Sequence, residues 1–348
     1  VLELYSSALR NGDGLAAKWA PREKQNKQLA ARLKGYMGLS WPDYRQLLAN
    51  SSNTVEQLMC AGNWSLINYS HVPSVASARL TKTFGRHDGN RYGEYINAVR
   101  NNKVDPSTGK VAKINTGAVY PYDVLKSHVD DRTADAMWMN LPDFVPAGQS
   151  FIPVIDVSGS MQQGSPSALD VAVSLGMYLA ERNKSAFKNL GMTFNTNPRW
   201  FTIPEGTVRQ REHAVKGSDG QMCGSTDLDK AMCMIIDTAV KNRIAPDDMP
   251  TNLIILSDME FNTGSYGYGT TTVAERTRAR FKLAGYNVPG IVWWNIASRH
   301  GTTPVRHNEH GMALVSGFSP SIMTSLLGGE MTPEKIMIKA IMVDRYAH

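Results

Sequence analysis

The sequence predicts a mainly α-helical domain over residues 1–145, followed over residues 146–348 by an α/β domain with a doubly wound, mostly parallel sheet. Three observations support this prediction. The chain has 348 residues, more than the roughly 250 at which a single core stops growing. Apolar runs alternate regularly with helical patterns only in the second part. The stretch LPDFVPAGQS (141–150), with two prolines and a glycine, separates the two patterns.

The second part contains apolar runs that are typical of buried strands. They are FIPVID (151–156), LGMTFN (190–195), RWFTI (199–203), NLIILSD (252–258), GIVWWNI (290–296) and MALVSG (312–317). Helices are expected between and after them, over residues 167–183, 227–242, 271–284, 319–327 and 333–346. Almost uniformly apolar strands joined by helices indicate a parallel sheet that is covered on both faces.

The first part reads as a series of short helices. A helix over residues 22–37 is expected to have one apolar face and basic residues mainly on its other faces. The apolar residues at helical spacing are Leu29, Leu33, Tyr36 and Met37, and the basic residues are Lys24, Lys27, Arg32 and Lys34. Further helices are expected over residues 53–60, 73–84 and 88–100.

The composition is that of a globular protein, with 42% hydrophobic and 20% charged residues. No apolar run reaches the roughly 18 residues of a membrane-spanning helix, so no membrane association is expected. The cysteines Cys60, Cys223 and Cys233 show no C-x-x-C spacing, which argues against a disulfide framework and a zinc ribbon. We therefore expect an intracellular, reducing environment such as the cytoplasm.

Positive charge is concentrated in the first part of the chain. Residues 1–150 hold 18 Lys and Arg against 13 Asp and Glu, which leaves 19 against 18 in the rest of a chain of net charge +6. A second basic stretch comprises Arg79, Lys82, Arg86, His87, Arg91 and Arg100, with Tyr92 and Tyr95 among them. Cations neutralise phosphates and aromatic rings stack on bases, so RNA binding is one interpretation. A solvated helical surface is the other.

Several side chains with oxygen donors follow the ends of predicted strands. Asp156, Ser158 and Ser160 come at the end of the first apolar run, Asp258 ends NLIILSD, and Thr226 precedes a predicted helix. Ligands gather at the carboxyl ends of parallel strands, so these side chains are expected to converge. Carboxylate and hydroxyl oxygens suit Mg²⁺ or Mn²⁺. The alternative is that the hydroxyls only cap a helix and shape a turn.

The stretch D-V-S-G-S that begins at Asp156, together with Thr226 and Asp258, resembles the metal-ion-dependent adhesion site of von Willebrand factor A domains. The resemblance implies that Ser158, Ser160 and Thr226 contact the metal directly, and that Asp156 and Asp258 act mainly through water. It also implies an open metal position that an acidic side chain of a partner protein fills.

The loop NTGSYGYGTTT (262–272) follows Asp258 closely and is expected to overhang this site. Its glycines permit movement, and Tyr266 and Tyr268 would offer contact surface to a partner. A disordered connection is the alternative for this loop.

Longer stretches resemble an uncharacterised family of cellular and viral proteins, so the chain could be virus-encoded. They are KWAP (18–21), GNWSLINYSHVPSVASARLTKTFGRHD (62–88) and IVWWNIASR (291–299). The order of a helical part and a von Willebrand A domain is also similar to Ro autoantigen proteins, whose helical TROVE module binds small noncoding and misfolded RNAs. That similarity implies RNA binding by the first part, although about 150 residues are too few to close a ring of the Ro kind.

These observations together predict a non-enzymatic binding protein. Its basic helical part would bind RNA or a ribonucleoprotein, and its α/β part would bind a protein through Mg²⁺. Two alternatives stay open: a protein-only scaffold or adaptor, including a structural component of a viral particle, and an enzyme in which the metal activates water. The motifs G-x-S-x-G and G-x-x-x-x-G-K-[ST] are absent, and no general base is evident near Asp156. The oligomeric state is not specified by the sequence.

Overall fold

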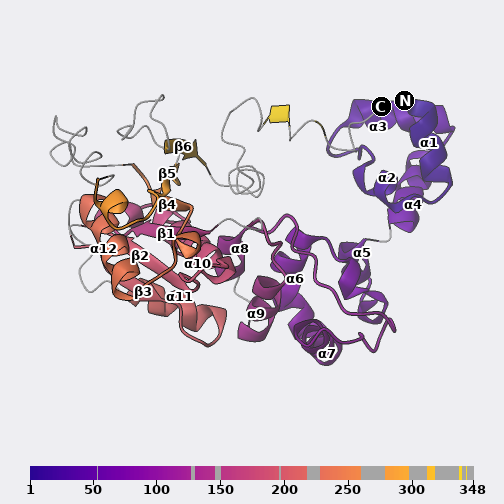
Figure 1. Ribbon diagram of the computed structural model, residues 1–348. Helices are drawn as coiled ribbons and strands as arrows, with labels where there is room; N and C mark the ends of the chain where they lie inside the picture. The colour runs from indigo at the N-terminus through magenta and orange to yellow at the C-terminus, as the bar shows by residue number, and fades with distance from the viewer. Residues whose placement is uncertain are drawn as a thin grey trace. The chain divides into compact units, whose positions relative to one another are not determined.

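The computed structural model describes residues 1–52, 54–126, 130–145, 150–195, 197–217, 228–259, 279–297, 312–317, 337, 338 and 342. Contacts divide the chain into two compact units. Figure 1 labels the helices and strands along the chain. We call residues 1–73 and 83–113 the helical unit, and residues 74–82 and 114–348 the sheet unit.

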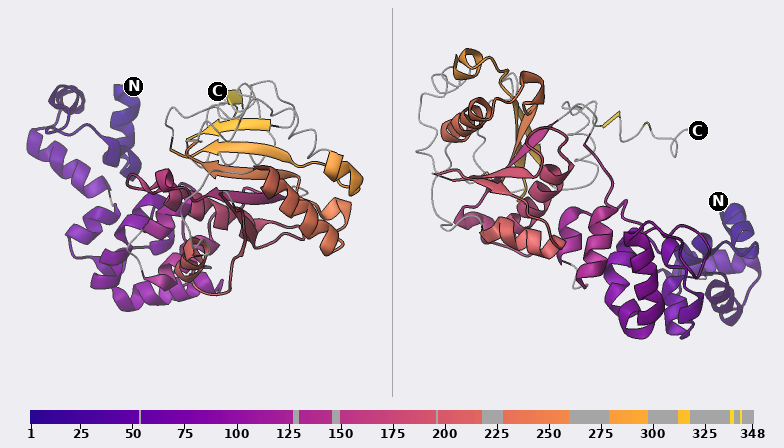
Figure 2. Two further views of the ribbon diagram at one scale, coloured as in Figure 1. Left: turned by 90° about the vertical axis from the view of Figure 1, so that its left-hand side faces the viewer. Right: turned by 60° about the horizontal axis from the view of Figure 1, so that its bottom comes forward.

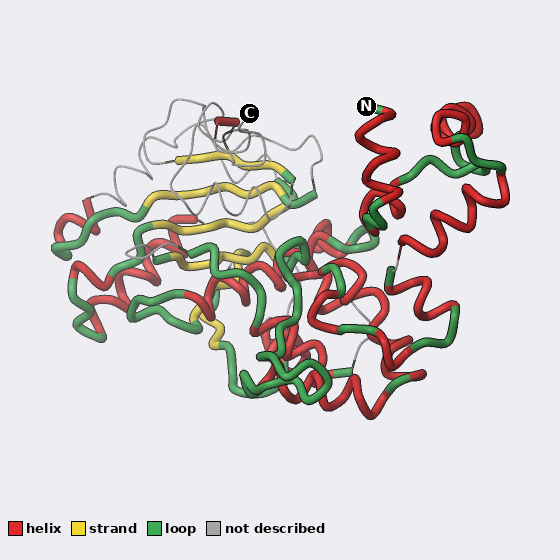
Figure 3. Tube along the Cα trace, turned by 90° about the vertical axis from the view of Figure 1, so that its right-hand side faces the viewer, coloured by secondary structure: helices red, strands yellow, loops and turns green. Residues whose placement is uncertain are grey.

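The sheet unit is built on six strands. They are β1 (Phe151–Asp156), β2 (Leu190–Phe194), β3 (Trp200–Thr202), β4 (Asn252–Ser257), β5 (Gly290–Asn295) and β6 (Met312–Ser316). Their order is β3-β2-β1-β4-β5-β6, and every neighbouring pair is parallel except β2 and β3. Figure 2 shows the parallel strands side by side, and Figure 3 shows them in yellow. The predicted doubly wound, mostly parallel sheet is confirmed, as are all six predicted strands.

Helices lie against both faces of this sheet. The described helices between residues 114 and 259 are α8 (Pro121–Lys126), α9 (Asp131–Met139), α10 (Ala168–Arg182), α11 (Val208–Gly217) and α12 (Leu228–Lys241), with the 3-10 turns η3 (Gly159–Gln162) and η4 (Pro246–Asp248). The predicted helices over 167–183 and 227–242 are confirmed, and residues 279–283 are the helical part of 271–284 that is described. The expected helix 319–327 and most of 333–346 lie outside the described residues. No helix in the described part of the chain has the length and apolarity needed to cross a bilayer.

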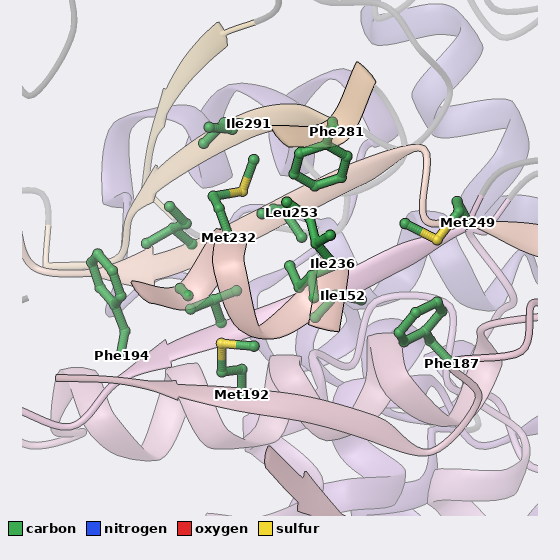
Figure 4. Packing of buried hydrophobic residues seen from close by; sticks show 14 of the residues in the cluster. Ile152, Phe187, Met192, Phe194, Met232, Ile236, Met249, Leu253, Phe281 and Ile291 are labelled. Atoms are coloured by element: carbon green, nitrogen blue, oxygen red, sulfur yellow. The ribbon is translucent and has the colours of Figure 1, made fainter. Parts of the chain in front are cut away.

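Alternate residues of the central strands form two apolar layers. On one face, Ile152 of β1 and Leu253 of β4 pack with Met232 of α12, all at most 2% exposed (Figure 4). On the other face, the backbone of α10 at Gly176 lies so close that an added Cβ would come within 2.6 Å of Ile155. Complete burial of each such side chain contributes about 1.5–3 kcal/mol, which explains why uniformly apolar runs form these strands.

Residues 114–145 belong to the sheet unit, and α9 packs against other helices of that unit. The indole N–H of Trp138 in α9 donates to Glu181 of α10 at 2.7 Å, and the other carboxylate oxygen of Glu181 accepts from Arg211 of α11 at 2.5 Å. The carboxylate of Asp135 accepts the backbone N–H of Val208 at 2.8 Å, at the start of α11. These contacts join α9 to α10 and α11, whereas the sequence-based division at residue 146 places α9 in the helical part.

The helical unit consists of short helices. They are α1 (Leu2–Arg10), α2 (Gly14–Trp19), α3 (Lys27–Met37), α4 (Trp41–Ser52), α5 (Val55–Cys60) and α7 (Gly89–Arg100), with the 3-10 turns η1 (Trp64–Leu66) and η2 (Tyr69–His71). The helix α6 (Ser74–His87) begins in the sheet unit and ends in the helical unit. The helices α1 to α4 share a small core that includes Leu9, Ala17, Leu33 and Leu48.

The expected apolar face of the first basic helix was half wrong. The helix α3 begins at Lys27, because Asn26 caps it by accepting the N–H of Leu29 at 3.1 Å. It buries Ala30, Leu33 and Met37, whereas Leu29 is 46% and Tyr36 52% exposed. The small side chain of Ala30 brings the stripe at positions 30, 33 and 37 against the core, which turns positions 29 and 36 toward solvent.

Candidate metal site at the ends of β1 and β4

The strands β1 and β4 are parallel neighbours at the centre of the sheet, and Ile155 is paired with Leu256. Asp156 is the last residue of β1, and Asp258 directly follows Ser257, the last residue of β4. The chain leaves β1 toward β2 on one side, while β4 lies on the other side. The carboxyl ends of β1 and β4 therefore flank a topological switch point, the usual place for a ligand in a doubly wound sheet.

The carboxylate of Asp156 is buried, with 2% of the residue exposed. One oxygen accepts the backbone N–H of Ser158 at 2.9 Å, and the other accepts the hydroxyl of Ser257 at 2.6 Å. The hydroxyl oxygen of Ser257 in turn accepts the backbone N–H of Met259 at 3.0 Å. Asp156 thus shapes the turn that carries Ser158 and fixes the end of β1 to the end of β4.

The hydroxyls of Ser158 and Ser160 lie together on this turn, with their oxygens 3.1 Å apart. The turn continues into η3, where Met161 is fully buried and anchors the segment. Adjacent ligands of an octahedral Mg²⁺ ion, with bonds of about 2.0–2.1 Å, lie about 2.9 Å from each other. The spacing of the two serine oxygens therefore suits two adjacent ligands of one small cation.

Burial raises the pKa of Asp156 to about 6, and the negative charge of Asp258 adds to this increase. Hydrogen bonds from Ser257 and Ser158 act in the opposite direction, because they stabilise the ionised carboxylate. Asp258 itself is 1% exposed. Two buried carboxylates at neighbouring strand ends favour the binding of a cation, which would balance their negative charge.

Three of the predicted site residues cannot be placed in the structure, and one residue of the site was not predicted. Thr226 and the loop residues Tyr266 and Tyr268 lie outside the described residues. Ser257 was not among the predicted site residues, although a single hydroxyl in the apolar run before Asp258 was a usable signal. Within the described ranges, no three His, Cys, Asp or Glu side chains group closely enough to hold a metal. A metal at this site would therefore depend on serine and threonine hydroxyls as well as carboxylates.

The first basic cluster is largely exposed. Lys24, Lys27 and Arg32 are exposed, whereas Lys34 is partly buried. The ammonium of Lys34 donates to the carbonyl of Leu39 at 2.8 Å and lies 5.4 Å from the ring centre of Trp41. Lys34 therefore stabilises the end of α3, and the other three cations are available to a partner.

In the second basic stretch, Arg79, Lys82 and Arg86 are exposed and follow helical spacing along one face of α6. The expectation that Tyr92 and Tyr95 could stack on bases was wrong, because they are only 4% and 1% exposed. Both rings pack against Tyr69. The guanidinium of Arg91 is also turned inward and bonds to Asp88 and to two backbone carbonyls. The side chains at positions 91, 92 and 95 thus hold the helical unit together.

Two solved structures align with this chain over part or most of its length. The Ro (RSR) protein of Deinococcus radiodurans aligns with a TM-score of 0.44 and 16% identity, covering 92% of this chain and 63% of that protein. The proximal thread matrix protein 1 of the mussel byssus, with a zinc-occupied MIDAS motif, aligns with a TM-score of 0.36 and 11% identity, covering 54% and 48%.

Sequence comparison gives closer matches. The uncharacterized protein L728 of Acanthamoeba polyphaga mimivirus is 27% identical over 345 residues, which cover 91% of this chain and 58% of the relative. This chain therefore spans less than two thirds of the relative's length. A model described as a domain of unknown function, DUF2828, matches residues 40–142, and a second, DUF7788, matches residues 150–345. Because the second model matches more than half of the chain, the chain belongs to the DUF7788 family.

Proposed function

We propose that the sheet unit binds a divalent cation, Mg²⁺ or Mn²⁺, at the ends of β1 and β4 and uses it to hold an acidic side chain of a protein partner. The main support is the pair of hydroxyls of Ser158 and Ser160, 3.1 Å apart, on a turn that the buried carboxylate of Asp156 shapes. The resemblance of Asp156, Thr226 and Asp258 to a metal-ion-dependent adhesion site adds to this support.

In this proposal Ser158, Ser160 and Thr226 hold the cation directly, and Asp156 and Asp258 balance its charge and orient its waters. The bound cation would supply an open coordination position that attracts a carboxylate oxygen. Binding, rather than catalysis, is the activity of this site. The exposed Cys60 forms no disulfide within the described residues, which fits the proposed reducing, intracellular location such as the cytoplasm.

Affinity capture from the cells that make the protein tests this function. Partners should be retained in Mg²⁺, released by EDTA, and lost in both Ser158→Ala and Thr226→Ala. The control is Ser165→Ala, which changes an exposed serine in the segment between η3 and α10 and should retain the partners. Partners that persist in EDTA and in both site variants would contradict the proposal.

RNA binding by the basic helices is a second candidate function. The exposed cations Lys24, Lys27 and Arg32, together with those on α6, favour it. Replacing these three residues of the first cluster by Gln should weaken RNA binding and reduce its dependence on salt. A scaffold that binds only proteins would give an interaction with little salt dependence, and no RNA would be recovered with the purified protein.

A further inference from the structure

We propose that the helical unit carries a stacking platform for the bases of single-stranded RNA, formed by the rings of Trp64 and His87. This inference rests on the proposed RNA-binding function and gives it a location. The two rings are stacked, with centres 4.7 Å apart and planes inclined by 4°. His87 is exposed and Trp64 is partly buried, so the pair lies at the surface. Every nucleic acid base has a flat face that can extend such a stack.

The segment around Trp64 projects apolar and polar side chains into solvent. Leu66 is 66% exposed, and Asn63 and Ser65 are exposed on either side of Trp64. Short polar side chains next to an aromatic ring can bond to base edges once a base is stacked. The segment therefore offers both kinds of contact that unpaired bases use.

Arg91 holds this exposed segment in place from inside the unit. Its guanidinium donates to the carbonyl of Ile67 at 2.8 Å and to that of Trp64 at 2.5 Å. It also bonds to Asp88, whose carboxylate accepts the hydroxyl of Tyr69 at 2.7 Å. A surface loop fixed by several internal bonds presents its ring without a large loss of conformational entropy on binding. This prior ordering is what a binding platform requires.

Exposed basic residues are present in the same unit as the platform. Arg86 is exposed and directly precedes His87. The segment 103–113 folds back on itself through the pairing of Val104 with Val111, and it contacts the loop where the N–H of Lys113 donates to Ser70 at 3.4 Å. Within residues 54–73 and 83–113 of the helical unit, the exposed basic residues are Arg86, Arg100, Lys103, Lys110 and Lys113.

The same residue ranges contain fewer exposed acidic residues than exposed basic residues. Glu56 and Glu94 are exposed, whereas Asp88 is bonded to Arg91 and Asp105 is 2% exposed. The charge favours an anionic partner, and the stacked rings favour RNA over an acidic protein as that partner.

Fluorescence anisotropy with a labelled oligouridylate of about 20 nucleotides tests the platform on the whole chain. Trp64→Leu removes the aromatic ring and should weaken binding about tenfold, with the salt dependence unchanged. Trp64→Phe keeps a flat ring and should bind nearly as well as the wild type. His87→Ala should weaken binding, whereas His71→Ala, an exposed histidine of the same unit, should not. Arg86→Gln should lower the slope of log affinity against log salt by about 1.

The outcomes separate the platform from the broader RNA function. If the wild type binds the oligomer and both Trp64→Leu and His87→Ala bind equally well, the platform is wrong and RNA binds elsewhere. If the wild type binds no RNA, the proposed RNA function fails and the platform with it. Binding of a labelled polyglutamate that is lost in Trp64→Leu, without binding of RNA, would replace RNA by an acidic protein. Circular dichroism and hydrogen exchange confirm that each variant is folded.

Discussion

The two units bury their apolar side chains in different ways. In the sheet unit, β1 is buried at every position, and Leu253 of β4 is fully buried. In the helical unit, α3 buries a single stripe and leaves Leu29 46% exposed. Apolar identity alone therefore predicts burial in strands that are covered on both faces, whereas in short helices the position on the helix decides.

A charged residue that is bonded inside the fold performs a similar task in each unit. Asp156 shapes the turn that presents Ser158 and Ser160, and Arg91 fixes the segment that presents Trp64. In both places the charged side chain is bonded internally, and its neighbours in the loop carry the proposed contacts. A charged residue within a motif can therefore hold a site in shape, while its neighbours form the contact surface.

The largest expected effect is in the core of the sheet. Leu253→Ala should lower the free energy of unfolding of the sheet unit by about 2–5 kcal/mol, because it leaves a cavity between β1, β4 and α12. Hydrogen exchange measured by mass spectrometry in increasing urea would resolve peptides of the two units. A loss below about 1 kcal/mol would show that this core is less tightly packed than the structure indicates.

The charge of Asp156 should make the stability of the metal-free sheet unit depend on pH. Its pKa is raised from 3.8 to about 6, so the folded state holds this proton more tightly than the unfolded state does. The resulting stabilisation is complete below about pH 4 and is lost as pH rises through about 6. The loss amounts to about 2–3 kcal/mol.

The variant Asp156→Asn isolates this pH-dependent contribution to stability, because the asparagine side chain cannot ionise. In the absence of metal the variant should become more stable relative to the wild type as pH rises between about 4 and 6, with a constant difference above that range. Thermal melts of both proteins across this range, with and without Mg²⁺, provide the check. A difference that does not vary with pH would show that the carboxylate is not destabilised when ionised.

A smaller effect is expected in the helical unit at Arg91. Arg91→Met should cost about 2 kcal/mol, because Asp88 loses its cation and two carbonyls lose a donor. The control is Arg45→Met, whose pair with Glu23 is largely exposed and should contribute less than about 0.5 kcal/mol. Equal losses in exchange protection for the two variants would contradict the supporting role of Arg91.

The smallest expected effect is at Leu29. Leu29→Ala should change stability by no more than about 0.5 kcal/mol, because the side chain is 46% exposed. Leu33→Ala, one helical turn later and only 2% exposed, should cost about 2 kcal/mol or more in the same exchange measurement. If the two variants lose equal stability, Leu29 is buried in solution, and the apolar face predicted from the sequence is correct at this position.

The sequence predicted the sheet well because its strands are almost purely apolar and are bounded by polar turns. It also indicated the ends of β1 and β4, since Asp156 and Asp258 interrupt those runs abruptly. Ser257 was harder to find, because its role depends on the register that places it beside Asp156. Strand register is a tertiary property that a local pattern does not contain.

Other features also depended on tertiary contacts. The helix α9 belongs with the sheet through Trp138 and Glu181, a pair 43 positions apart in the chain. Tyr92 and Tyr95 looked available beside basic residues, but they pack on Tyr69 in an aromatic cluster. An amphipathic pattern in a short helix fits more than one face, and only packing with neighbouring helices selects among them.

Isothermal titration of Mg²⁺ into the metal-free protein tests the central claim most directly. Wild type and Ser165→Ala should bind with equal affinity, while Ser158→Ala and Asp156→Asn should show greatly weakened binding or none, with their folds intact. This result would establish the ends of β1 and β4 as a metal site. Equal Mg²⁺ affinity in all four proteins, or no binding by the wild type, would contradict the claim.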